Sequence, residues 1–227
     1  MMFKPDDLKL RRKTWIKAAG LPKHLQGWEF DDCTAVPADV IEDIQNWLTK
    51  VKGNKIINAI GERSCGKGMA FYGSPGHGKT TLASAIIQEA IRTFSLDVFP
   101  LNDVRPCYFI TYAGLLDLKG EMMDDSVEES REILYDGIMG ACSDEHRNVK
   151  ILVIDDVGRE HNNASAWNKS MLHHVLRTRF NNGLPTIVTS NILLDNWPDW
   201  YGEATGSFAH EAFYNIDLES TEGDLRQ

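Results

Sequence analysis

Residues 73–80 read GSPGHGKT, follow an apolar run and have the residue types of a phosphate-binding loop. The spacing fits G-x-x-x-x-G-K-[ST], with the two glycines at Gly73 and Gly78. Glycines let backbone N–H groups approach phosphate oxygens, the lysine reaches the β- and γ-phosphates, and the hydroxyl can ligate Mg²⁺. We therefore predict that ATP is bound by Gly73, Ser74, Pro75, Gly76, His77, Gly78, Lys79, Thr80 and Thr81.

The second candidate stretch is ILVIDDVG at 151–158, an apolar strand pattern that ends in two carboxylates. Packing does not explain two charges at the end of a buried strand, because a buried charge needs a partner. A Mg²⁺ ion at the carboxyl end of the strand, across from the phosphate loop, is such a partner. We predict that Asp155 and Thr80 ligate Mg²⁺ and that Asp156 polarises an attacking water. The alternative interpretation is an Asp-Asp turn or helix cap.

The third stretch is PTIVTSN at 185–191, another apolar strand pattern that ends in an amide. At that edge of a sheet Asn191 can orient the water or sense the γ-phosphate. A Ser-Asn pair after a strand is also an ordinary turn, so the prediction depends on the other two stretches. Taken together, the three stretches predict Lys79, Asp156 and Asn191 as catalytic residues.

Helix patterns alternate with apolar strand patterns along the chain. The predicted helices, marked by apolar spacing and terminal signals, are 6–19, 38–51, 79–94, 126–141 and 165–180. The predicted strands, which are short and apolar, are 68–72, 107–111, 150–154, 185–190 and 212–216. This alternation favours an α/β fold with three layers, in which helices cover both faces of a central parallel sheet.

The composition limits the class of protein. The chain has 227 residues, of which 42% are hydrophobic, and a net charge of −9. No run approaches the about 18 apolar residues of a membrane-spanning helix, so no membrane partner is predicted. The charged N-terminus lacks the apolar stretch of a secretory signal. The four cysteines are scattered without a C-x-x-C pair, which predicts reduced thiols in the cytoplasm rather than a zinc site.

Charge is unevenly distributed. Residues 4–23 contain seven lysines and arginines against two aspartates, and the remainder is acidic. An acidic body disfavours wrapping of duplex DNA, because phosphate contacts need clustered cations. We divide the chain into a basic N-terminal arm, 1–24, and an ATPase domain, 25–227. The arm helix either docks a partner or packs on its own domain, and the predicted docking face contains Leu8, Arg12, Trp15 and Ala19.

The motifs resemble those of AAA+ P-loop NTPases, in particular the DnaC/DnaI-type replicative-helicase loaders and the related IstB-type transposition ATPases. The resemblance rests on AGLPKHLQGWEFDDC, GKGMAFYGSPGHGKTTLASAI, ILVIDDVGRE and VLRTRFNNGLPTIVTSN, and covers roughly residues 18–227. It implies a sheet with the phosphate strand central, ATP-dependent self-association and single-stranded DNA in a central channel. It also implies a Walker A motif at Lys79 and Thr80, a Walker B motif at Asp155 and Asp156, and sensor 1 at Asn191.

The sequence also departs from this family pattern. Asp-Asp replaces the common Asp-Glu, which makes the candidate base one methylene shorter. The expected arginine finger is missing, because residues 192–225 contain no Arg or Lys. Arg179, which precedes Phe-Asn-Asn, or Arg177 is a candidate substitute, and Arg226 falls where the family shows a terminal arginine. The segment after Asn191 is too short for a full helical lid, so the lid is predicted to be minimal or absent.

Three functions follow as expectations. The leading one is an ATPase that self-associates with ATP and Mg²⁺ and delivers or remodels a replicative DNA helicase on single-stranded DNA. The second is an IstB-like helper that binds DNA and recruits a transposase, which the acidic body disfavours. The third is an adaptor that binds ATP without hydrolysing it, in line with the missing arginine finger.

Overall fold

The computed structural model of the protein describes residues 5–122, 129–158 and 166–219. In these residues the sheet has five strands in the order β2-β3-β4-β1-β5. The strands are β1 Gly68–Tyr72, β2 Cys107–Thr111, β3 Ile151–Val157, β4 Thr186–Ser190 and β5 Phe213–Asp217. All neighbouring pairs are parallel, and β1, which leads into the phosphate loop, lies between β4 and β5. The predicted α/β fold is confirmed.

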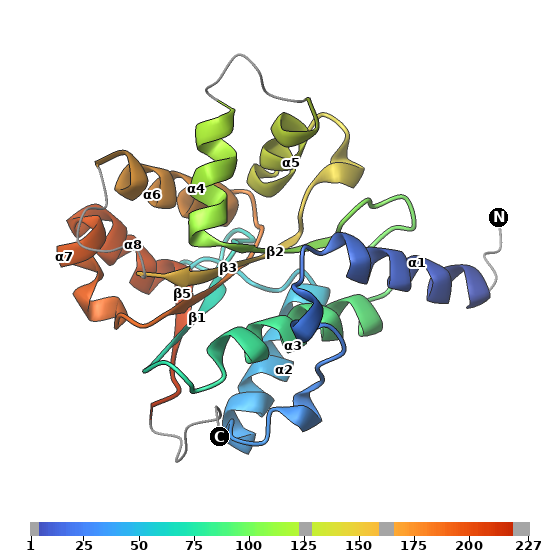
Figure 1. The fold of residues 1–227 in the computed structure, drawn as a ribbon, viewed down its shortest axis with the longest axis horizontal. Coiled ribbons are helices and arrows are strands. Elements are labelled where there is room, and N and C mark those ends of the chain that lie inside the picture. Colours follow the sequence, from blue (N-terminus) through green and yellow to red (C-terminus); the bar gives the residue numbers. More distant parts are fainter. Residues whose placement is uncertain (1–4, 123–128, 159–165, 220–227) are drawn as a thin grey trace.

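Helices cover both faces of the sheet, with α2 and α3 on one side and α4, α5 and α6 on the other (Figure 1). The helices are α1 Pro5–Ala18, α2 Ala38–Lys52, α3 Lys79–Thr93, α4 Tyr112–Glu121, α5 Glu129–Met139, α6 Ala166–Asn181, α7 Trp197–Tyr201 and α8 Glu203–Ala212. Within the described ranges, no helix has the length and apolar character needed to cross a bilayer.

Most predicted elements agree with the observed ones, but the patterns do not predict α4, α7 and α8. Helix α4 follows β2 directly and contains two glycines, which weakens its sequence pattern. It starts because the hydroxyl of Thr111 accepts a hydrogen bond from the Gly114 N–H at 3.0 Å. Helix α8 packs closely on α7, since a Cβ at Gly206 would lie only 2.5 Å from the Pro198 side chain. These helices therefore depend on local capping and packing that periodicity does not report.

Strand β3 extends three residues beyond its predicted end, to Val157. Asp155 and Asp156 therefore lie inside the strand and not after it. The pairing of β3 with β4 shifts between Ile154 and Val157, and Asp156 has a φ of 60°. The carboxylates are thus positioned by an irregularity in a buried strand, which corrects the prediction that they follow its end.

Helix α1 packs on the sheet domain through the face that is predicted to dock a partner. Trp15 is 1% exposed, and its indole N–H donates to the carbonyl oxygen of Asp103 at 2.7 Å. Arg12 donates to the carbonyl oxygen of Phe94 at 3.2 Å, and Ala19 is fully buried. These contacts support the alternative that α1 packs on its own domain, and docking of a partner through α1 stays a prediction.

We predict that Trp15→Ala lowers the free energy of unfolding by about 3–5 kcal/mol, the usual cost of removing a fully buried large aromatic side chain. The measurement is urea unfolding followed by circular dichroism. Leu10→Ala is the matched control on the same helix, because Leu10 is 68% exposed and its loss should have little effect. Equal stabilities for the two variants would show that α1 does not pack on the domain in solution.

Candidate functional site

The phosphate loop joins the carboxyl end of β1 to the first turn of α3. Three of its glycines have positive φ values, 138° at Gly73, 101° at Gly76 and 72° at Gly78, which side chains resist. The loop leads directly into the amino end of a 15-residue helix, where backbone N–H groups and the helix dipole favour an anion. Ser74, Pro75 and His77 complete the loop, and Nδ1 of His77 lies 3.0 Å from the Ser74 carbonyl oxygen.

Lys79 places a positive charge beneath this loop. The residue is 7% exposed, and its Nζ donates to the carbonyl oxygens of Gly73 at 2.6 Å and Ser74 at 2.8 Å. Carbonyl oxygens are neutral acceptors, so an anion in the loop would bind this ammonium more strongly. The arrangement fits the predicted role of Lys79 as a ligand of phosphate oxygens.

Asp155 is joined to the phosphate loop by a shared hydrogen-bond network. Its Oδ1 accepts hydrogen bonds from the hydroxyl of Thr80 at 2.9 Å and the hydroxyl of Thr189 at 2.6 Å. Burial raises the pKa of Asp155, while the hydroxyls of Thr189 and Thr80 act in the opposite direction. The fold therefore brings together Thr80 and Asp155, the two residues predicted to hold Mg²⁺.

Asp156 and Asn191 lie at the same edge of the sheet. The backbone N–H of Asp156 donates to the Thr189 hydroxyl at 2.9 Å. A φ of 60° is uncommon for a residue with a side chain, and such strain is concentrated at functional sites. Asn191 is exposed and follows Ser190, whose neighbours across the sheet are Tyr72 and Val157. It therefore lies one residue beyond the level of Tyr72, where the phosphate loop begins.

Thr189 is a site residue that the motifs do not predict. Its single hydroxyl donates to the Asp155 carboxylate and accepts from the Asp156 N–H, so it positions that carboxylate and the backbone of Asp156. The available signal was a hydroxyl in the apolar run of β4, and the structure buries this residue to 1% exposure. Buried hydroxyls need hydrogen-bond partners, and here the partners belong to the site.

Arg179 does not belong to the site. It is fully buried, and its guanidinium donates to the carbonyl oxygens of Ile138, Val149 and Pro185, among others. Burial lowers the pKa of Arg179 to about 9, so the group remains charged at neutral pH. The prediction of Arg179 as a catalytic residue is wrong, because a guanidinium held in the core cannot reach a phosphate in another subunit.

Glu219, the last described residue, lies on the phosphate loop. Its carboxylate accepts a hydrogen bond from the hydroxyl of Ser74, and a Cβ on Gly73 would lie 3.2 Å from the Glu219 nitrogen. The Ser74 hydrogen bond lowers the pKa of Glu219, so the group is an anion at neutral pH. A fixed negative charge therefore lies at a loop built to bind anions. Arg226 lies outside the described residues.

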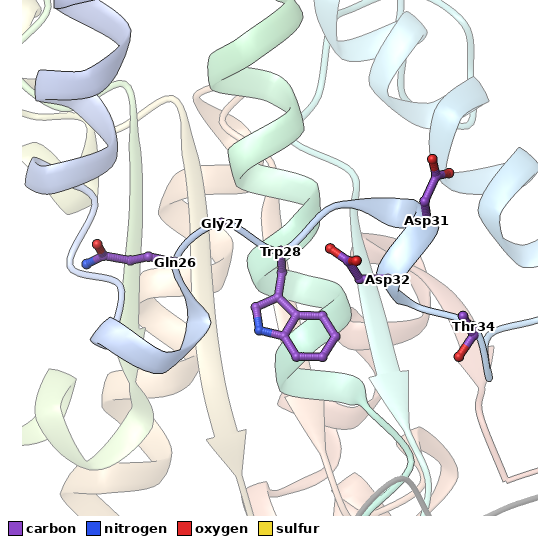
Figure 2. Close-up of a pocket in the computed structure, with 6 residues that line it drawn as sticks. All are labelled: Gln26, Gly27, Trp28, Asp31, Asp32 and Thr34. Atoms are coloured by element: carbon purple, nitrogen blue, oxygen red, sulfur yellow. The ribbon is translucent and has the colours of Figure 1, made fainter.

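A separate pocket of about 500 Å³ lies beside α3, and Figure 2 shows Trp28, Asp31 and Asp32 among its six lining residues. Hydrogen bonds to α3 hold the segment that borders the pocket. The side chain of Gln88 accepts from the Gly27 N–H at 2.7 Å and donates to the Leu25 carbonyl oxygen at 2.9 Å. No residue of the phosphate loop lines this pocket. Its two carboxylates disfavour phosphate, so we do not assign it to the site.

The residues of the site fit ATP with Mg²⁺. Glycines with positive φ leave the loop backbone open to phosphate oxygens, and Lys79 supplies a cation. A hydroxyl and a carboxylate are oxygen ligands of the kind that Mg²⁺ prefers, and Thr80 and Asp155 already share a hydrogen bond. The observed donor set therefore agrees with the motifs.

The family assignment follows from a comparison with protein-family models. Residues 69–196, more than half of the chain, match the ATPase family associated with various cellular activities (AAA). The chain belongs to the AAA family. It is thus a nucleotide-binding P-loop ATPase, and the predicted resemblance to AAA+ proteins is confirmed. No curated protein matches this AAA chain in sequence.

Solved structures show the same fold. DnaI is 19% identical with a TM-score of 0.57, covering 91% of this chain and 94% of its own. The DnaC helicase loader is 24% identical with a TM-score of 0.59, covering 86% of this chain and 99% of its own. AMPPCP-bound DnaA from Aquifex aeolicus is 16% identical with a TM-score of 0.54, covering 84% of this chain and 50% of its own. At these identities the likeness concerns the fold.

We predict that Glu219→Gln tightens ATP binding by about twofold to fivefold, because it removes an exposed like charge beside the phosphates. The measurement is the Kd for ATP with Mg²⁺ by isothermal titration calorimetry. Glu145→Gln, which removes an exposed carboxylate elsewhere on the surface, should leave the Kd unchanged. Unchanged affinity in Glu219→Gln would indicate that this carboxylate does not remain beside the loop in solution.

Proposed function

We propose that this AAA protein is an ATP-controlled assembly factor that delivers or remodels a replicative DNA helicase on single-stranded DNA in the cytoplasm. The single observation that most supports it is the buried hydrogen-bond network of Thr80, Asp155 and Thr189, which joins the phosphate loop to β3 and β4. Family membership supports ATP as the ligand. The fold shared with DnaI and the DnaC helicase loader supports the role in replication.

Each site residue has a role in this proposal. Lys79 binds the β- and γ-phosphates, and Thr80 and Asp155 hold Mg²⁺, which offsets phosphate charge when it is bound. Asp156 accepts a hydrogen bond from a water and polarises it for attack on the γ-phosphate. Asn191 orients the same water from the end of β4. The bound triphosphate then controls the association of subunits.

We predict that Lys79→Ala abolishes ATP binding and, with it, ATP-dependent self-association, because the loop loses its buried cation. Asp156→Asn should keep ATP binding and lose at least about a hundredfold in turnover, since an amide cannot take a proton from water. Calorimetry, analytical ultracentrifugation and phosphate release measure the three effects. Lys79→Ala thus tests ATP binding, and Asp156→Asn tests ATP hydrolysis with binding intact.

The proposed helicase role is tested separately, by measuring helicase binding and loading with the unaltered protein and with Lys79→Ala. Purified protein with ATP and Mg²⁺ should bind the replicative helicase of its host and place it on circular single-stranded DNA, whereas Lys79→Ala should not. Failure to bind that helicase in either nucleotide state would refute the delivery role. ATP binding and self-association would remain separate findings.

A second candidate function is an adaptor that binds ATP without hydrolysing it. It is favoured by the lack of any Arg or Lys in residues 192–225 and by the burial of Arg179. Of the two candidate arginines, Arg177 is the one that can still serve another subunit, because it is exposed on α6 with its Cζ 4.3 Å from the ring centroid of Phe208 in α8. The two functions therefore differ in whether Arg177 supports turnover.

If this protein hydrolyses ATP in assemblies, we predict that Arg177→Ala lowers turnover by about 10³-fold, as loss of an arginine finger does. Mixing Arg177→Ala with Asp156→Asn, which keeps ATP binding, should restore part of the activity, because one subunit supplies Asp156 and the other supplies the arginine. A mixture no more active than its components would exclude this role in trans. No turnover by the unaltered protein, with ATP binding intact, would favour the adaptor.

A further inference from the structure

We infer that this protein has a second anion-binding surface, at the amino-terminal ends of β1 and β5, that binds single-stranded nucleic acid. We call it the Tyr214 patch, and its central residues are Lys50, Lys55, Lys67 and Tyr214. The inference deepens the proposed function and rests on it for the class of ligand, but binding at the patch does not depend on ATP.

The centre of the patch is an exposed aromatic ring between two cations. Lys67 immediately precedes β1, and Tyr214 in β5 pairs with Met69 of β1, so the two side chains emerge close together. Nζ of Lys67 lies 4.7 Å from the ring centroid of Tyr214, and Nζ of Lys50 lies 5.7 Å from it. Tyr214 is 38% exposed although it belongs to a strand of the central sheet. Its ring is therefore accessible to a ligand.

The backbone around the patch holds the cations in place. The indole N–H of Trp47, in the core, donates to the carbonyl oxygen of Lys67 at 3.0 Å. The N–H of Lys55 donates to the Lys50 carbonyl at 2.9 Å, at the end of α2. The N–H of Cys65 donates to the Ile56 carbonyl at 2.8 Å, which brings residues 63–67 back beside residues 55–57. These contacts fix the backbone of Lys50, Lys55 and Lys67 near one end of the sheet.

Residues 50–67, which contain the three lysines of the patch, have a net positive charge, whereas the whole chain has a net negative charge. Residues 50–67 contain five lysines and arginines against one carboxylate, Glu62, whereas the full chain has a net charge of −9. An acidic protein that concentrates cations at one place attracts polyanions there. Lysines provide phosphate contacts without reading sequence.

The aromatic ring decides between classes of polyanion. Proteins that bind single strands combine a cationic surface with aromatic rings on which bases stack. Bases in a duplex are already stacked on each other and would not stack on Tyr214. An acidic peptide would contact the ammonium groups but would not use the ring for stacking. Because Nζ of Lys50 and Nζ of Lys67 lie over the ring of Tyr214, a base that stacks there must displace an ammonium group, and the flexible lysine side chains can then contact the flanking phosphates. Single-stranded nucleic acid is therefore the ligand that can contact both the ring of Tyr214 and the lysines of the patch.

The patch and the nucleotide site lie at opposite ends of β1. The strand has five residues, so at about 3.3 Å per residue the two ends are separated by about 17 Å. The phosphate loop follows Tyr72, and the patch begins before Gly68. Binding at the patch can therefore be measured apart from binding of ATP.

The test uses the full chain, a fluorescein-labelled dT20 oligonucleotide and fluorescence anisotropy without nucleotide. Lys50→Ala/Lys67→Ala should weaken binding and reduce the slope of log K against log salt by about 1.4, which corresponds to two phosphate contacts. Tyr214→Ala should weaken binding by about tenfold, while Tyr214→Phe, which keeps the stacking ring, should not. Urea unfolding checks that each variant is folded.

Two comparisons make the test decisive. Lys9→Ala/Lys13→Ala removes the same charge from exposed positions on α1 and should keep dT20 affinity. If both double variants weaken binding equally, the attraction is to overall charge and the patch is refuted. Lys79→Ala, which tests the proposed function, should bind dT20 normally. If only Lys79→Ala loses dT20, or if a polyglutamate peptide binds the patch and dT20 does not, the inference is overturned.

Discussion

A buried carboxylate joins the parts of this site. Asp155 is 4% exposed, burial raises its pKa, and two hydroxyls partly offset this by hydrogen bonds to the same oxygen. Those hydroxyls belong to Thr80 at the start of α3 and Thr189 in β4, so one charge sets the relative positions of three elements. Neutral donors only partly replace water around a carboxylate, and a cation at this position would lower its free energy further. The position of the Asp155 carboxylate is therefore a consequence of how α3 and β4 pack against β3.

A second buried charge holds the other end of the same strands. Arg179 fills the space between the start of β3, the end of α5 and the start of β4 with donors to neutral carbonyl oxygens, and it also donates to the Thr186 hydroxyl at 3.0 Å. A guanidinium has five N–H donors in a fixed geometry, so it can tie several chain segments together at once. The cation thus supports the positions of β3 and β4, which in turn position Asp155 and Thr189.

The sequence predicts the motifs well because the chemistry and backbone conformation of each short segment require particular residue types. Glycines at positive φ and the lysine after them identify the phosphate loop without knowledge of the fold. The roles of Arg179 and Thr189 depend on which strands are neighbours, and the order β3-β4-β1 is not encoded in any local pattern. Glu219 reaches the loop from 145 residues away, so no spacing rule can find it. Local chemistry is predictable from such a chain, whereas contacts between distant segments require the topology.

The Asp-Asp pair of β3 has a structural explanation. Asp156 has a φ of 60°, a left-handed conformation that Asp adopts several-fold more readily than most residues with side chains. This conformation occurs within the register shift between Ile154 and Val157, and the Thr189 hydroxyl stabilises it by accepting from the Asp156 N–H. A glutamate would have to adopt the same backbone conformation with a longer side chain and without that preference. The shorter carboxylate at this position therefore follows from the bulge in the strand, and its reach toward the phosphate loop is set by the backbone as much as by its side chain.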